Sequence, residues 1–519
     1  MNIPLLIETL VHLRPAQIYH QLQLRLHRPK FVAVAAPSAW QTTQIVKPID
    51  KPQCYEAGGS FTFLNITSRV KDWNMNEHGA LWVYNLNYMD WLQQKDITEE
   101  DGLKWIDRFI DDMPENRVGL DPYPIALRII NWAKFFCQHP QRLNQRRRDS
   151  MYAQTILLSR KLEYHLLGNH LLEDAYAIFI ASIFFNDRRL YNKAKRLLAS
   201  QLDEQILPDG AHYEQSPMYH CIMLDRLLDC INFSSGNQLF DGQDAFTSLL
   251  IEKASSMLGH LQSVFYQDGS IPLLNDSAVG IAPTPHELFA YAERLHLQWS
   301  ALPLRECGYR KMGNKGMEIV ADIGNITCHY QPGHSHADTL SFEMRADGQP
   351  VIVDTGISTY NKNERRQYER STAAHNTVTI GGEDSSRVWG GFRVGRRATV
   401  EILKDSPSEL VARHDGFGRQ AIHQRRFAFC GDTFCIEDDV VGTGKGERVS
   451  YLHFSPSAHA CIISETDGLV KAGSIVIKIE GFTKLVMTKN HVSTEYNKLR
   501  ACDVLEIIFD RHLKCQFQS

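Results

Sequence analysis

Two histidines two positions apart open the stretch of this sequence with the clearest metal-binding chemistry. In an extended segment, the rings of His334 and His336 would share one face. Asp354 ends an apolar run further on, and His375 opens another. Imidazoles plus a carboxylate, with water completing a tetrahedron, suit Zn²⁺ better than Mg²⁺ or Ca²⁺. Because spacing alone cannot join distant residues, polar strand ends bonded to nearby loops remain the alternative interpretation.

Two polar blocks in the N-terminal half could supply acid–base groups. The first, at 168–174, interrupts a helical pattern, and helical continuation would put His170 and Glu173 on one face. The second, at 209–220, is a turn that opens into a helix and is crowded with titratable side chains. Such crowding favours catalysis, although Asp-Gly and Ser-Pro also serve as ordinary helix-start signals.

A third polar group, at 387–397, holds four arginines and two aromatic residues without one acidic residue. Arginine forks pair with carboxylates or sulfates, and a tryptophan face stacks on sugars or guanidinium groups. The segment therefore indicates an anionic glycan surface. A solvated strand whose arginines are paired elsewhere is the alternative.

The elements that must position these residues change in type near residue 305. Amphipathic helical periodicity dominates before it, and period-two alternation rich in Val, Ile, Thr and Phe follows it. Consecutive helices must bury their apolar stripes against each other, whereas many short strands indicate an antiparallel sandwich. The expected helices cover 7–26, 105–113, 123–136, 151–166, 170–185, 190–202 and 249–265, and the expected strands include 318–321, 351–353, 377–380, 399–403 and 475–479.

Composition excludes several functional classes. The 519 residues are 43% hydrophobic and 22% charged, which predicts a multidomain globular protein. A net charge of −4 argues against nucleic-acid binding. The longest apolar run, 175–185, is shorter than the about 20 residues that a membrane helix needs. Scattered cysteines and an N-terminus unlike a secretory signal lead us to expect a cytoplasmic location, with the periplasm as the alternative.

Six stretches make the sequence recognisable, at 81–92, 123–132, 168–177, 209–220, 332–356 and 370–398. In this order they resemble the heparinase II/III-like polysaccharide lyases. The resemblance implies a multidomain α+β fold with an N-terminal (α/α) toroid followed by a C-terminal antiparallel β-sandwich. We expect a lead-in over 1–80, the toroid over 81–305 and the sandwich over 306–519, with the substrate cleft between the two domains.

The resemblance also implies roles for individual residues. Asn169 would bind and neutralise a uronate carboxylate, assisted by His170 or Glu173. Tyr219 would be the catalytic acid, and also the base for one substrate stereochemistry, while His334 would be the catalytic histidine. His170 completes the expected catalytic set. The expected substrate-binding residues are Arg128, Glu173, Tyr213, Glu214, Tyr368, Trp389 and Arg393.

A cofactor and a substrate class follow from the same resemblance. His336, Asp354 and His375 match the family's ligands for one zinc ion, Zn²⁺, with a mainly structural role. The segment 8–29 resembles family members associated with bacterial exopolysaccharide, capsule or O-antigen production. The expected partner is thus an acidic polysaccharide, with neither nucleic acid nor a membrane span, and both monomer and homodimer stay open.

The sequence therefore predicts a lyase that cleaves a uronic-acid-containing polysaccharide by β-elimination. One alternative is a glycan-binding or assembly protein that kept the fold without turnover. Another is a glycoside hydrolase that uses paired carboxylates such as Glu173 and Glu214. Elimination leaves an unsaturated sugar end and hydrolysis does not, so product analysis separates these hypotheses.

Overall fold

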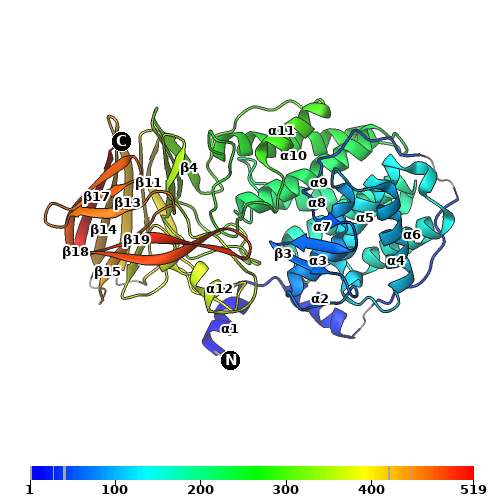
Figure 1. Ribbon diagram of the computed structural model, residues 1–519, viewed down its shortest axis with the longest axis horizontal. Helices are drawn as coiled ribbons and strands as arrows, with labels where there is room; N and C mark the ends of the chain where they lie inside the picture. Colours follow the sequence, from blue (N-terminus) through cyan, green and yellow to red (C-terminus); the bar gives the residue numbers. More distant parts are fainter. Residues whose placement is uncertain are drawn as a thin grey trace.

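The computed structural model describes residues 3–26, 29–38, 42–418, 421–442, 444 and 446–518. Figure 1 shows an elongated molecule with helices at one end and strands at the other. The predicted fold class is confirmed: an (α/α) toroid precedes an antiparallel β-sandwich in a multidomain α+β chain. No helix in the described ranges is long and apolar enough to cross a membrane.

The toroid is built from inner and outer helices. The inner helices α5, α7 and α9 are buried on nearly all sides and pack side by side. The outer helices α6, α8 and α10 pack against α5, α7 and α9 in turn. This pairing buries the apolar stripes that the sequence pattern predicts. The bounds are α3 (Ala80–Tyr88), α4 (Glu99–Asp112), α5 (Pro122–Gln138), α6 (Gln145–Arg160), α7 (Gly168–Phe184), α8 (Arg188–Gln205), α9 (Pro217–Ser235), α10 (Gln243–Val264) and α11 (Pro285–Arg294).

Helix boundaries differ from the expectation in several places. The helices α4, α6 and α10 each begin six residues earlier than expected, at 99, 145 and 243. The single helix expected over 7–26 is wrong: α1 (Ile3–Leu10) and α2 (Pro15–Leu26) are separate, with Pro15 starting the second. Proline lacks the N–H that a continuous helix needs, but its fixed φ suits a first helical position. The helix α6 ends at Arg160 rather than 166. Of α9, only the opening turn was foreseen.

The sandwich consists of a large antiparallel sheet and a four-stranded sheet, β4-β5-β6-β7. The large sheet runs β11-β12-β13-β14-β19-β18-β17-β16, with β15 pairing β19 and β8. Aromatic side chains from both sheets, including Phe342, Phe427 and Phe434, meet in its core. The bounds are β4 (Tyr309–Gly313), β5 (Met317–Asp322), β6 (Phe342–Ala346), β7 (Gln349–Ile352), β8 (Val378–Ile380), β11 (Val400–Ser406), β12 (Glu409–His414), β13 (Ala421–Cys430), β14 (Thr433–Gly442), β15 (Arg448–His453), β16 (Cys461–Ser464), β17 (Leu469–Ala472), β18 (Ile475–Glu495) and β19 (Lys498–Gln518).

The chain before α3 wraps the toroid. Extended residues run along the side of the helices that faces away from the sandwich (Figure 1). The backbone N–H of Ala36 donates to Asp149, and Val46 exchanges hydrogen bonds with the Asn232 side chain. A small sheet of β1 (Tyr55–Glu56), β2 (Ser60–Phe63) and β3 (Ile66–Arg69) follows, and its aromatic residues join the hydrophobic core of the helices. The division of the chain at residues 80 and 305 stays a prediction.

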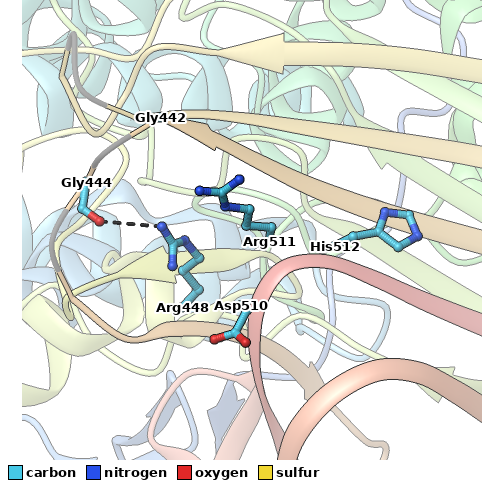
Figure 2. A pocket seen from close by; sticks show the side chains of 6 residues that line it. All are labelled: Gly442, Gly444, Arg448, Asp510, Arg511 and His512. Carbon is cyan, nitrogen blue, oxygen red and sulfur yellow. Dashed lines mark hydrogen bonds between the residues drawn. The ribbon is translucent and has the colours of Figure 1, made fainter.

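A surface hollow of about 620 Å³ lies on the sandwich, at β14, β15 and β19. Figure 2 shows its charged lining, in which Arg448 donates to the Gly444 carbonyl at 3.5 Å. In the described ranges, this lining includes none of the predicted zinc ligands His336, Asp354 and His375. It also includes no residue of the polar blocks at 168–174 and 209–220.

Candidate active site

A cleft of about 540 Å³ lies where the helices meet the sandwich. The helical side contributes residues of α3, α7 and α9, including Asn169 and Tyr219. The loops that connect the sandwich strands contribute His334 and Tyr360, and the turn between β18 and β19 contributes Tyr496. All four residues predicted as catalytic therefore line this one cavity: Asn169, His170, Tyr219 and His334.

Asn169 is held at the start of α7 by Glu214. The Glu214 carboxylate accepts from the Asn169 backbone N–H at 2.9 Å and from its side-chain amide at 2.8 Å. Gly168 makes this approach possible, because its φ is +60° and a Cβ there would lie 2.4 Å from a Glu214 oxygen. The second amide hydrogen of Asn169 points toward His334, with Nδ2 3.4 Å from Nε2. The amide is therefore fixed, with its oxygen and one hydrogen near the cavity.

Tyr219 lies in the first turn of α9 and faces the sandwich. Ser216 caps this helix by accepting from the Tyr219 N–H at 3.2 Å, and Pro217 follows at the first position. The Tyr219 ring stacks on the His334 ring with centroids 3.9 Å apart, and its hydroxyl is 3.3 Å from that of Tyr360. Burial raises the pKa of Tyr219 above its ordinary value. The phenol therefore keeps its proton at neutral pH in the free protein.

His334 is oriented by a carboxylate that the sequence did not identify. Its Nδ1 lies 2.9 Å from Asp276, which also accepts two hydrogen bonds from Arg366. Burial alone would raise the pKa of Asp276, but Arg366 and the hydrogen bonds from His334 and His336 hold it well below its usual range. Because an ionised carboxylate only accepts, Nδ1 carries a proton, and Nε2 is the ring nitrogen that faces the cleft.

His170 occupies one wall of the cleft beside an acidic partner. Its Nδ1 is 2.9 Å from Glu163, and its ring packs on Tyr123 with centroids 4.6 Å apart. Burial would lower the pKa of His170, but Glu163 outweighs this and raises it. A positive charge on His170 is thereby favoured at this wall of the cleft.

The three predicted zinc ligands come together beneath the cleft. Asp354 accepts from His375 Nδ1 at 2.7 Å, and the His336 and His375 rings are 5.3 Å apart. His336 Nδ1 and His375 Nε2 are buried and have no hydrogen-bond partner within the described ranges. Buried polar atoms without partners are costly, and imidazole nitrogens are good Zn²⁺ donors. His453 and Asp338 each place one further unpartnered atom close by in the same described part of the chain.

A second group could hold a metal ion on distance alone. Asp209, His260 and Cys307 offer ligand atoms that all lie within 4.8 Å of one another, and no other set in the described ranges meets this limit. However, Asp209 already accepts backbone hydrogen bonds from Arg305 and Cys307 at 3.0 Å. This carboxylate thus has a role without a metal, in tying the interdomain segment to the toroid.

The predicted substrate-binding residues divide into two sets. Glu214 lines the cleft, whereas Arg128, Glu173 and Tyr213 are buried away from solvent. The Arg128 guanidinium is 0% exposed and donates to Gln154 and to two backbone carbonyls, so it ties helices together. This placement corrects the expectation of substrate contact by Arg128.

Glu173 and Tyr213 need the same correction. Glu173 is 0% exposed, and Arg226 lies 3.6 Å from it. Burial raises the pKa of Glu173 to about 7, which Arg226 partly opposes. The Tyr213 hydroxyl pairs with that of Tyr330 at 2.7 Å. Glu173 therefore lies behind Asn169, one turn further along α7, and does not line the cleft in the described ranges.

The arginine cluster at 387–397 packs on the N-terminal helix rather than on the cleft. Glu8 of α1 binds Arg387 at 2.7 Å, and Trp389 donates to Thr9 at 3.1 Å. Arg393 lies over the Trp389 ring at 4.6 Å. Within the described ranges, neither Trp389 nor Arg393 lines the cleft, and nor does Tyr368, which hydrogen-bonds Asn490 at 2.6 Å. The alternative interpretation, arginines paired elsewhere in the chain, thus fits this cluster better.

An (α/α) toroid joined to an antiparallel sandwich, with polar residues of both domains in the cleft between them, defines the architectural class of the protein. Two family models match the chain, "Heparinase II/III N-terminus" over 149–292 and "Heparinase II/III-like, C-terminal" over 298–502. The chain belongs to the heparinase II/III-like family.

Similar proteins agree with this assignment. A heparin-sulfate lyase of Bacteroides thetaiotaomicron is 21% identical over 349 residues, 59% of this chain and 48% of that protein. One of Pedobacter heparinus is 22% identical over 326 residues, 58% of this chain and 47% of its own length. The chain thus spans about half the length of the curated relatives it matches.

Solved structures share the fold. A heparinase III crystal structure aligns with a TM-score of 0.68 at 14% identity, over 86% of this chain and 79% of that one. The heparan sulfate lyase HepC of Pedobacter heparinus aligns with a TM-score of 0.57 at 16% identity, over 97% and 87%.

Proposed function

We propose that this protein is a polysaccharide lyase that cleaves an acidic, uronate-containing polysaccharide by β-elimination. The observation that carries the proposal is the meeting of Asn169, Tyr219 and His334 in one interdomain cleft. An amide, a protonated phenol and an imidazole nitrogen that faces the cleft are what this reaction requires. The family membership and the lyase activity of the relatives support the same conclusion.

The reaction divides among these groups according to their protonation. His334 Nε2 takes the weakly acidic proton at C5, and the electron pair of that bond forms the C4=C5 double bond. Tyr219 gives its proton to O4 as the C4–O4 bond breaks. Asn169, with the positive charge favoured on His170, stabilises the negative charge that develops on the uronate carboxylate. Such a fixed donor is worth about 3–4 kcal/mol in other enzymes.

The paired-carboxylate hydrolase is less compatible with the cleft. Glu214 spends both oxygens on Asn169, and Glu173 is buried behind it. A hydrolase needs one carboxyl on each side of the scissile bond, with room for water in the inverting case. The non-catalytic binder is distinguished by experiment rather than by geometry.

Zinc is part of the proposal as a structural ion held by His336, Asp354 and His375. Its chemistry there is to bind neutral imidazoles and a carboxylate and so to join the loops that carry them. Asp276 accepts from both His336 and His334, which couples the metal-binding loop to the catalytic histidine. From the similarity of segment 8–29, we also propose a bacterial exopolysaccharide or capsule-type glycan as substrate. A cytoplasmic location is proposed separately, from the scattered cysteines.

A panel of uronate polymers tests the activity: alginate, heparan sulfate, chondroitin sulfate, hyaluronan and acidic bacterial exopolysaccharides. We expect near-ultraviolet absorbance to rise with at least one of them, because elimination creates a conjugated C4=C5 double bond. New reducing ends without absorbance would instead indicate a hydrolase. Tight binding without any product would indicate the glycan-binding alternative.

Metal content tests the zinc site. Carefully purified wild-type protein should hold about one equivalent of zinc, and His375→Ala should lose it together with several degrees of thermal stability. His423→Ala is the matched control, because His423 is also a buried sandwich histidine with a carboxylate partner, Asp438 at 2.8 Å. Loss of zinc in His260→Ala but not in His375→Ala would move the ion to the Asp209 group. Less than a tenth of an equivalent in wild type would contradict both sites.

A further inference from the structure

The part of the cleft that lies deepest among the helices is lined by charged side chains. Lys51, Asp90, Asp225 and Arg226 all contribute to its lining. The side chains of Lys51, Asp225 and Arg226 are only 9%, 2% and 5% exposed. If the axis of the toroid were open to water at this end, such side chains would be solvated. Their burial shows that the cleft has a closed inner end.

The extended N-terminal segment forms this closure. The Lys51 backbone N–H donates to the Gln93 carbonyl at 3.0 Å, and its ammonium reaches Asp225 at 2.9 Å. The same segment is tied to the end of α9 through Asn232. In Figure 1 it runs along the helices on the side away from the sandwich, opposite the domain junction where the cleft begins. A polymer chain therefore cannot thread through the toroid past Lys51.

Little room separates the catalytic groups from this closure. Asn169 and Glu173 are four residues apart on α7, a rise of about 6 Å. Arg226, which belongs to the inner end, is 3.6 Å from Glu173. This depth is comparable with the length of one sugar ring. A glycan bound with its cleavable bond at Tyr219 and His334 would thus reach the closure within about one residue.

The charges at the inner end indicate what kind of sugar fits there. Lys51 and Arg226 both bind Asp225, and Arg226 also lies 3.6 Å from Glu173, so the chain's own carboxylates already balance both positive charges. Asp90 Oδ1, which does line the cleft, is buried without a hydrogen-bond partner in the part of the chain that the structure describes. Burial raises the pKa of Asp90, which Lys51 and Arg226 partly oppose. The site therefore calls for neutral hydrogen-bonding groups, such as sugar hydroxyls, and disfavours sulfate or carboxylate.

We propose that the enzyme cleaves its polysaccharide from a chain end, with a terminal sugar bound through its hydroxyl groups at the closed inner end formed by Lys51, Asp90, Asp225 and Arg226. This inference rests on the proposed lyase function. It adds the mode of action and the chemistry of the terminal residue, and it assigns a substrate role to the N-terminal segment that carries Lys51.

Chain length followed alongside absorbance tests the proposal. Each polymer of the panel, from alginate to hyaluronan, is digested and analysed by size-exclusion chromatography at increasing absorbance. Chain-end cleavage releases one small product from the start while the remaining polymer stays near full length. A halving of the mean chain length within the first few per cent of the final absorbance would overturn chain-end action and leave the lyase intact. No absorbance from any polymer would overturn both.

Two substitutions test the inner end itself. Lys51→Met removes the ammonium but leaves Arg226 paired with Asp225, and Asp90→Asn is nearly isosteric. Each should lower kcat/KM at least tenfold while the far-ultraviolet circular dichroism stays unchanged. Lys47→Met is the matched control, because Lys47 lies in the same segment and forms an exposed pair with Asp50 at 2.8 Å. Folded Lys51→Met and Asp90→Asn proteins with the kcat/KM of Lys47→Met would overturn the proposal.

Discussion

Replacing Tyr219 by phenylalanine should lower kcat by about 10²–10⁴-fold, the usual contribution of a general acid. The phenol is the group that the cleft keeps protonated, because burial raises its pKa. Phenylalanine preserves the ring that stacks on His334 at 3.9 Å but cannot deliver a proton to O4. KM should change little, since the ring surface that contacts substrate is retained. The measurement is initial rate by absorbance on the best polymer of the panel.

A matched control separates chemistry from stability in this experiment. Tyr330→Phe also removes a hydrogen-bonded tyrosine hydroxyl, which pairs with Tyr213 at 2.7 Å and with Glu204 at 2.9 Å, but Tyr330 does not line the cleft in the described ranges. Each lost hydrogen bond should cost about 1 kcal/mol of unfolding free energy. Tyr330→Phe should therefore lose at least as much thermal stability as Tyr219→Phe and yet keep wild-type activity. Near-full activity in Tyr219→Phe would remove this residue from the mechanism.

Sequence reasoning located the fold because both periodicities were strong. The helices α5 and α7 and the strands of the large sheet carry long regular patterns, and packing reinforces them. Breaks set by a single residue were harder: Pro15 divides α1 from α2, although the apolar spacing continues across it. Short-range rules therefore succeed where local pattern and tertiary packing agree.

The sequence predicted only those residues of the candidate site that lie in recognisable motifs. Asn169, Tyr219 and His334 lie in stretches that resemble a known family, and the fold brings them together. Asp276 and Arg366 were missed because each stands alone in a loop or a short helix, 90 positions apart. Their pairing depends on the approach of the α10–α11 loop to the sandwich, which no local pattern encodes. The one sequence signal for Asp276 was the polar dipeptide Asn275-Asp276, which stands in the half of the chain where helices were expected.

Arg128 and Arg393 illustrate the opposite error. Arginine was expected to bind an anionic glycan, yet Arg128 is fully buried and satisfied by helix-end carbonyls. Arg393 lies over Trp389, on the surface that α1 covers. Residue type indicates which partners are chemically suitable, but only the fold decides whether the partner is a ligand or the chain itself.

Among the buried carboxylates near the cleft, we expect Asp276 to have the largest effect on catalysis. It fixes the tautomer of His334, accepts from His336 and neutralises Arg366, all without solvent. In Asp276→Asn, the amide can offer a hydrogen to His334 Nδ1, which would place the imidazole proton on Nε2, the atom that must act as base. A comparable change of tautomer in a serine protease triad lowers kcat about 10⁴-fold.

We therefore expect Asp276→Asn to lower kcat by at least about 10³-fold with little change in KM, because substrate contacts through Asn169 are untouched. Leaving Arg366 buried without its anion should also cost about 3–5 kcal/mol of unfolding free energy. The double variant Asp276→Asn/Arg366→Gln removes that unpaired charge, so it should regain stability without regaining activity. Asp268→Asn, which breaks the partly exposed pair with Arg345, is the control. Recovery of activity together with stability in the double variant would show that Asp276 supports the fold alone and does not position His334.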